Sequence, residues 1–141
     1  MPEDLATDFL FDMSVELEGV TNVGATPLGR RLIFYVKGGT FEGPKLRGEI
    51  LPGGGDWALV SSDGATRLNV RVVLRTDDGD VIYMTYRGIS YTPTDGSEPY
   101  FRTAPFFETA SEKYSWLNRI VAVGFGAFAE GRLGYKVYEI L

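Results

Sequence analysis

Hydrophobic and polar residues alternate along several short stretches of this chain. The clearest stretch runs from Thr66 to Thr76, where nearly every second position is apolar. Because successive side chains of a strand point to opposite faces, this period of two predicts a strand with one face on a core. The core face carries Leu68, Val70, Val72 and Leu74, and the opposite face carries Arg67, Asn69, Arg71, Val73 and Arg75. That second face meets either water or a polar cavity.

Glycines and Asp-Gly pairs separate the other short stretches, which are rich in Val, Ile, Tyr, Phe and Thr. This punctuation is typical of hairpins in an all-β domain. Asp63-Gly64 and Asp78-Gly79 are the best turn signals, because Asp-Gly tolerates the positive φ of a type I′ turn. We expect strands near 8–18, 29–38, 45–51, 56–62, 66–77, 80–90, 99–109, 117–128 and 133–140.

Helical periodicity is almost absent. Only the stretch 110–118 looks helical, and it is too short for an independent helix, so we expect at most one helical turn near 111–117. Nothing supplies the helices of parallel βαβ units. We therefore predict an all-β fold with one domain over 1–141, an antiparallel β-barrel of about nine strands whose closure removes exposed sheet edges.

The composition narrows the chemistry. The 141 residues include no histidine and no cysteine, which excludes disulfides, thiolate nucleophiles, cysteine-ligated zinc and imidazole bases. No Asp/Glu cluster has calcium-loop spacing, so we expect no metal ion and no other cofactor. Any chemistry must use carboxylates, Tyr, Ser, Thr, Lys, Arg or backbone dipoles.

Charge and aromatic content bear on partners and location. A net charge of −5 argues against binding nucleic acid or anionic membranes. The first residues, MPEDLATDFLFDM, lack the basic and apolar regions of a signal peptide, so we expect a soluble cytoplasmic protein. Aromatic residues on both faces of the strands favour self-association as a homodimer or higher homo-oligomer.

The segment 51–57 carries the first candidate for chemistry. Three glycines allow close approach of a ligand or a strand, and Asp56 and Trp57 follow at once. A carboxylate beside an indole can act as a base in a partly dry pocket. The alternative is a bulge between strands, with Trp57 in the core and Asp56 capping turn amides.

Two arginines are candidates to hold an anion. Arg102 lies among aromatic residues, where a guanidinium can stack, bind a carboxylate or hold an enolate oxygen; the alternative is an ion pair with Asp56 or Glu108. Arg71 lies in the middle of a strand. It needs an anionic partner if its face lines the barrel interior, and it is an ordinary solvated arginine if that face is outside.

The short turn before the penultimate strand carries the third candidate group, Tyr114, Trp116 and Asn118. These residues either rim a pocket or plug one end of the barrel as packing. Both interpretations stay open from the sequence.

Four ordered segments resemble the DUF3237 family, also called UPF0311. They are GGTFEGPKLRGEILPGGGDW (38–57), RTDDGDVIYMTYRG (75–88), YFRTAPFFET (100–109) and YSWLNRIVAVGFG (114–126). The resemblance spans nearly the whole chain and implies a barrel of the lipocalin or allene-oxide-cyclase shape class. Some fungal relatives look like small-molecule cyclases that close an oxygen heterocycle. The family's motif positions fall on Gly54, Asp56, Trp57, Arg71, Tyr86, Arg102, Thr103, Tyr114, Trp116 and Asn118.

These residues favour a cofactor-independent isomerase or cyclase that acts on a small apolar or aromatic molecule in the barrel. In this hypothesis Asp56 transfers a proton, Arg71 or Arg102 stabilises a developing oxyanion, and Tyr86 or Asn118 donates a hydrogen bond. The substrate-binding residues are Trp57, Thr103, Tyr114, Trp116 and Asn118. The alternatives are a non-catalytic barrel that binds a small ligand and a purely structural barrel.

Overall fold

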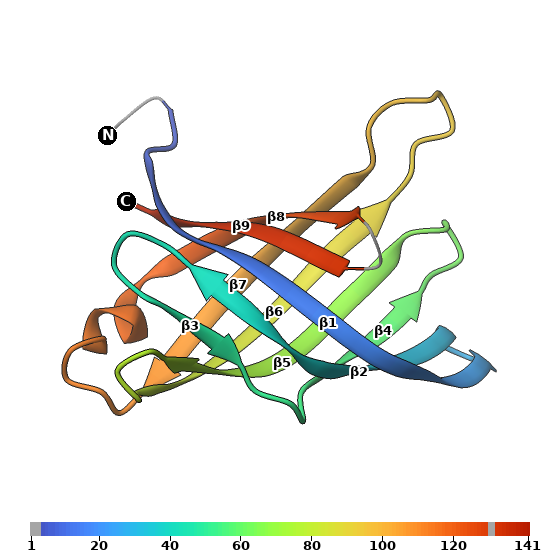
Figure 1. The fold of residues 1–141 in the computed structure, drawn as a ribbon. Coiled ribbons are helices and arrows are strands. Elements are labelled where there is room, and N and C mark those ends of the chain that lie inside the picture. The colour runs from blue at the N-terminus through green and yellow to red at the C-terminus, as the bar shows by residue number, and fades with distance from the viewer. Residues whose placement is uncertain (1–3, 130–131) are drawn as a thin grey trace.

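The computed structural model describes residues 4–129 and 132–141. Over these residues it contains nine strands and one short 3₁₀ helix, η1 (Figure 1). The strands are β1 (Thr7–Thr26), β2 (Gly29–Glu42), β3 (Arg47–Ile50), β4 (Gly55–Val60), β5 (Thr66–Thr76), β6 (Val81–Tyr91), β7 (Tyr100–Thr109), β8 (Val121–Ala129) and β9 (Arg132–Ile140), and η1 covers Ser115–Arg119.

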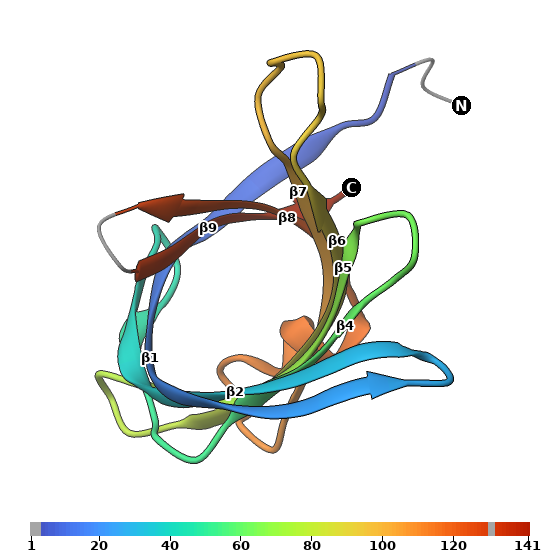
Figure 2. The same cartoon turned by 90° about the vertical axis from the view of Figure 1, so that its right-hand side faces the viewer.

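The sheet closes on itself. β1 pairs with β2 on one side and with β9 on the other, and the remaining strands complete the ring (Figure 2). Every pairing is antiparallel. The predicted all-β antiparallel barrel is therefore confirmed. So are the two Asp-Gly turns, where Gly64 and Gly79 have φ of 85° and 92° and join β4, β5 and β6 into a meander.

Three strands differ from the sequence prediction by several residues, and one of them is β2, which continues to Glu42 instead of ending near residue 38. β1 continues to Thr26 instead of ending near residue 18, and its second half forms a long hairpin with β2. Bulges near Gly19 and Gly24, whose φ values are 125° and 99°, interrupt the alternation there, and this irregularity hides the strand in the sequence. β8 begins at Val121 and not near residue 117, because residues 115–119 form η1.

β2 is long enough to pair with two short strands in succession. Arg30–Tyr35 pair with β4, and Gly39–Glu42 pair with β3. Both short strands also pair with β5. The segment 51–54 therefore crosses a narrow gap between β2 and β5, and a β-carbon on Gly54 would lie only 2.4 Å from the carbonyl oxygen of Arg71.

The hydrophobic core occupies the barrel interior towards the end that η1 covers. Phe11 packs edge-to-face on Phe41 and Phe107, with ring centroids 5.5 and 6.0 Å apart. The buried Leu117 of η1 and the preceding Tyr114 join this core. They cover the end of the barrel that carries the β5–β6 turn, where Tyr114 hydrogen-bonds Asp78. Within the described residues, no helix is long and apolar enough to cross a bilayer.

Replacing Gly54 with alanine tests the narrow gap beside β4. The added methyl group meets the Arg71 carbonyl, so we expect the free energy of unfolding to fall by about 1–3 kcal/mol. Gly134→Ala is the matched control, because its β-carbon would have 3.9 Å to the nearest atom, and we expect a change within about 0.5 kcal/mol. Urea denaturation measures both. Equal effects of the two substitutions would contradict the packing described here.

Candidate functional site

Asp56 is a buried carboxyl group on the inner face of the barrel. It is the second residue of β4, opposite Phe34 of β2 and Val70 of β5, and 7% of its surface is exposed. The backbone N–H of Asn69 donates a hydrogen bond to its Oδ1, at 2.9 Å. Burial raises the pKa of Asp56, and the Asn69 hydrogen bond opposes this rise only in part. The Asp56 carboxyl group is therefore protonated more readily in the barrel than an aspartate side chain in water.

Asp56 lines a cavity of about 150 Å³. Thr66 and Ser90 also line it, and they lie at the ends of β5 and β6 away from η1, so the cavity occupies the end of the barrel that the helix does not cover. The other lining residues are apolar: Leu17, Phe34, Leu68, Phe101, Phe128 and Leu133. This is a small apolar chamber with one ionisable group in its wall.

Two buried tyrosines lie next to this chamber. The ring of Tyr135 packs edge-to-face on Phe101, which lines the cavity, and on Tyr86, at centroid distances of 5.5 and 5.2 Å. Burial raises the pKa of both phenols. Neighbouring Tyr135 and then the charge of Asp56 raise that of Tyr86 further, while the Tyr86 hydroxyl opposes the rise at Tyr135 and Asp56 adds to it. Both hydroxyls are therefore neutral at physiological pH. The phenol oxygen of Tyr135 is buried and lies near the Tyr86 hydroxyl, but it makes no hydrogen bond of normal length and angle within the described chain.

Tyr86 and Thr103 are buried at inward positions of β6 and β7, and neither is among the residues that line the cavity with Asp56. Tyr135 was not among the predicted site residues. In the sequence, Tyr135 is marked only by its inward position in the alternation of β9. Any aromatic residue of the core has such a position, so the sequence does not identify it as a site residue. Pairing across the closed ring is what brings it near Asp56.

The two candidate arginines lie on the outer face instead. Arg71 follows the inward Val70 in β5, is exposed, and lies over the ring of Trp57 at 5.3 Å. Arg102 follows the inward Phe101 in β7 and is half-buried. Neither the Arg102–Asp56 nor the Arg102–Glu108 ion pair considered from the sequence forms between these described residues. The cavity with Asp56 receives neither guanidinium.

The third candidate group lies at the end that η1 closes. Tyr114 donates a hydrogen bond to Asp78 at 3.2 Å. The side-chain amide of Asn118 both accepts from the N–H of Thr109 and donates to its carbonyl, at 2.7 and 3.0 Å. Trp116 packs against the core beneath Lys45. The structure places these three residues near one another and away from Asp56. Their contacts are those of residues that plug one end of the barrel, which was the second interpretation of the sequence.

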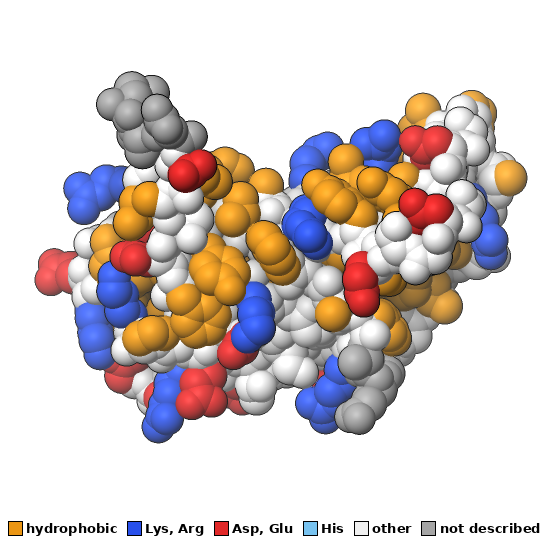
Figure 3. Space-filling model, turned by 90° about the horizontal axis from the view of Figure 1, so that it is seen from above, with side chains coloured by type: hydrophobic (Ala, Val, Ile, Leu, Met, Phe, Trp, Pro, Cys, Tyr) orange, Lys and Arg blue, Asp and Glu red, His pale blue; other side chains and the backbone are white. Residues whose placement is uncertain are grey.

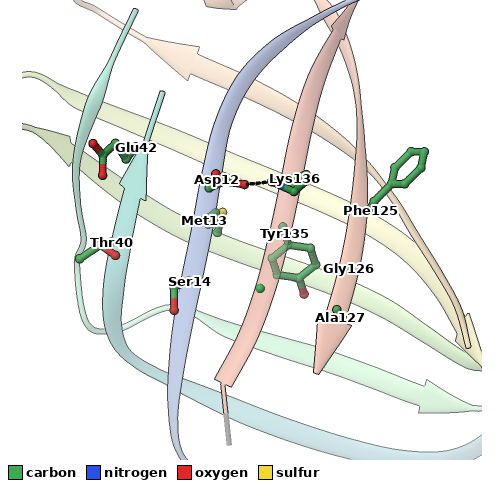
Figure 4. Close-up of a pocket in the computed structure, with 11 residues that line it drawn as sticks. Asp12, Met13, Ser14, Thr40, Glu42, Phe125, Gly126, Ala127, Tyr135 and Lys136 are labelled. Atoms are coloured by element: carbon green, nitrogen blue, oxygen red, sulfur yellow. Dashed lines mark hydrogen bonds and ion pairs between the residues drawn. The ribbon is translucent and has the colours of Figure 1, made fainter. Parts of the chain in front are cut away.

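Larger hollows occur on the outside of the barrel. One of about 490 Å³ crosses β1, β2, β8 and β9 (Figure 4). Its Asp12 and Lys136 form an ion pair of 2.8 Å across neighbouring strands, so these two charges already satisfy each other. Across residues 4–129 and 132–141, no three carboxylates gather as they would around a metal ion.

Residues 5–140 match the sequence model of a family described as "Protein of unknown function (DUF3237)". The chain belongs to this family. This DUF3237 protein is 31% identical to a UPF0311 protein of Rhodopseudomonas palustris over the full length of both. It also superimposes on the crystal structure of a β-barrel-like protein from Acinetobacter baumannii with a TM-score of 0.93 and 35% identity, over 100% of this chain and 99% of the other.

A fungal relative has a named activity. A hydroalkoxylation enzyme of Penicillium herquei is 33% identical to the DUF3237 protein over 87 residues, which cover 62% of this chain and 51% of the enzyme. The crystal structure of an enzyme from the same organism has a TM-score of 0.81 at 23% identity, over 100% of this chain and 98% of the other. This second likeness shows a common fold.

Substituting Asp56 tests its burial through the pH dependence of stability. A carboxyl whose pKa is raised in the folded state binds a proton more tightly there than in the unfolded chain, so stability falls as pH rises through that raised pKa. Asp56→Asn removes this penalty. We therefore expect the variant to be more stable than the parent at pH 7, with a difference that shrinks as pH is lowered towards the ordinary aspartate pKa.

Urea titrations between acidic and neutral pH measure this difference. Asp63→Asn is the control with the opposite sign, because hydrogen bonds from Ser61 and Ala65 lower the pKa of Asp63. Relative to the parent, the Asp63→Asn variant should be less stable at neutral pH, and this difference should shrink at acidic pH. A gap between Asp56→Asn and the parent that did not change with pH would contradict the assignment.

Tyr135→Phe tests the unpartnered phenol. Because the hydroxyl is buried without a partner, its removal should leave stability unchanged or raise it by about 1 kcal/mol. Tyr114→Phe removes a hydroxyl that is hydrogen-bonded to Asp78, and we expect it to lower stability by about 1 kcal/mol. Thermal and urea denaturation compare the two variants. A loss of stability in Tyr135→Phe as large as in Tyr114→Phe would show that the Tyr135 hydroxyl is satisfied.

Proposed function

We propose that this protein is a cofactor-independent cyclase that adds a hydroxyl group across a carbon–carbon double bond within one small apolar molecule. The observation that carries the proposal is the buried Asp56, whose pKa is raised and whose side chain lines an apolar cavity at one end of the barrel. A carboxylic acid in such a place is suited to give and take back a proton. The named activity of the fungal relative is of the same class.

The reaction needs only one acid. Protonated Asp56 donates its proton to one alkene carbon, and the neighbouring carbon becomes a carbocation. The hydroxyl oxygen of the same substrate bonds to that carbon, and its proton returns to the Asp56 carboxylate. One C=C π bond and one O–H bond are lost while one C–H bond and one C–O bond form, so the step needs no oxidant, reductant or cofactor.

The charge distribution supports a neutral substrate. The residues that line the cavity include no lysine and no arginine, so an anionic ligand would meet Asp56 without a compensating cation. Arg71 and Arg102 therefore have no part in this mechanism. Thr66 and Ser90 line the cavity with Asp56, and their hydroxyls can hydrogen-bond the substrate's oxygen and orient it.

The volume supports a small substrate. A cavity of about 150 Å³ matches the size that holds one benzene-like ring. The apolar walls of Phe34, Phe101 and Leu133 suit such a ring, and a bound ring would displace the water that could otherwise capture the carbocation. Any larger part of the molecule must extend out of the open end.

Turnover of ortho-methallylphenol in deuterium oxide tests the proposal. We expect conversion to dimethyldihydrobenzofuran with one deuterium in a methyl group, detected by NMR. Asp56→Asn should lose at least about a hundredfold of this rate, as expected for a missing general acid. Arg71→Gln on the outer face is the matched control and should keep it. Undiminished turnover by Asp56→Asn would refute the proposal.

The pH profile gives a second readout of the same acid. Because the protonated form of Asp56 starts the reaction, kcat/KM should fall as pH rises through its raised pKa. If the unmodified protein binds the phenol in the cavity but converts none of it at any pH, the barrel is a ligand-binding module and the enzyme proposal is wrong.

A further inference from the structure

Arg102 lies in a groove on the outer face of the barrel, separate from the cavity with Asp56. The groove has a volume of about 470 Å³, within the usual range for small-molecule sites. β7, β8 and β9 contribute Tyr100, Arg102, Val123, Phe125 and Tyr138, and Leu5 precedes β1 at its edge. The space-filling view shows hydrophobic side chains gathered with basic ones between them on the upper face (Figure 3).

The sheet itself leaves room here. β7 and β8 pair only at Arg102–Phe125 and Thr103–Gly124. Thr103 and Gly124 face the interior at this point, where the Thr103 hydroxyl oxygen lies 2.2 Å from the position of a Gly124 β-carbon, so the outward side chains of this pairing are those of Arg102 and Phe125. The groove therefore lies where few strand pairings join β7 to β8, and outward aromatic side chains stand beside it.

The guanidinium of Arg102 is held between two aromatic faces. Its central carbon lies 4.8 Å from the ring centroid of Tyr100 and 4.3 Å from that of Phe125. One nitrogen, Nη1, donates to the carbonyl of Phe101 at 3.0 Å. A guanidinium carries five N–H donors in a rigid fork. This one hydrogen bond therefore leaves other N–H groups of Arg102 able to bind a carboxylate.

Arg102 has no counter-ion within the described part of the chain, although it is half-buried. Nearby Lys136, by contrast, forms an ion pair with Asp12. A positioned, partly desolvated arginine without an anion is the arrangement that recognises a carboxylate through two parallel hydrogen bonds.

Exposed aromatic rings extend from the arginine. Phe125 is 49% exposed and Tyr100 41% exposed. Phe125 packs edge-to-face on Tyr138, which packs on Phe9, at centroid distances of 5.9 and 5.6 Å. A planar apolar ligand would cover this platform and remove its surface from water.

We propose that this outer groove binds an aromatic carboxylate, with the carboxylate on Arg102 and the ring against Phe125 and Tyr138. The site is independent of the proposed reaction at Asp56. It differs from the cavity in the sign of its charge, so the two sites select different ligands: neutral molecules inside and anionic aromatic molecules outside.

Titration with benzoate, followed by proton–nitrogen NMR, tests the proposal. We expect saturable shifts at the backbone amides of residues 100–103 and 123–125, and no comparable shifts with neutral benzamide. Arg102→Gln should weaken benzoate about tenfold or more, since it removes a charge-assisted pair. Arg71→Gln is the matched control, because Arg71 also stacks on an aromatic ring outside the barrel, and it should bind as the parent does.

Three outcomes would overturn the inference. The first is no saturable benzoate binding, and the second is equal affinity in Arg102→Gln and the parent. In the third, the chemical shifts of these amides change with the concentration of the protein and not with that of benzoate. That result would mean that a second copy of the chain covers the groove. Asp56→Asn should leave benzoate binding unchanged, so failure here and failure of the cyclase proposal are distinguishable.

Discussion

Pairing of β1 with both β2 and β9 closes the sheet, and the division of side chains into interior and exterior depends on that closure. In an open sheet, alternate residues point to the two faces of the sheet, and these faces differ only in which other parts of the protein cover them. In a closed barrel, one face becomes an enclosed volume of fixed size. Adjacent residues of one strand, such as Val70 and Arg71, are then separated by the wall itself.

The position of Asp56 costs the fold stability. Gly54 and Gly55 allow β4 to lie close to both β2 and β5, with a hypothetical β-carbon of Gly55 only 2.9 Å from the carbonyl of Phe34. The strand then directs a carboxyl group into an apolar interior, where the Asn69 N–H compensates part of its lost hydration. Buried groups that destabilise a fold in this way are concentrated where a protein does chemistry.

The two ends of the barrel differ in how well their polar groups are satisfied. At the end that η1 covers, Tyr114 and Asn118 both hydrogen-bond neighbouring groups, so this end has the character of a closed and stable floor. Towards the other end lie the small cavity, the acid with the raised pKa and the unpartnered phenol of Tyr135. Satisfied groups hold the barrel together at one end, and the acid that lines the cavity remains available to a ligand at the other.

The sequence by itself determined the all-β class, the Asp-Gly turns and the alternation of β5, because these depend on local backbone preferences and on a period of two. It also singled out Asp56, through the three glycines before it. Alternation alone says that Val70 and Arg71 face opposite ways but not that Val70 faces the interior with Asp56. Nor does it reveal that Tyr135, almost eighty residues further along the chain, lies near Asp56. Only the tertiary structure decided these points, since strand register and ring closure fix which side is enclosed and which distant residues meet there.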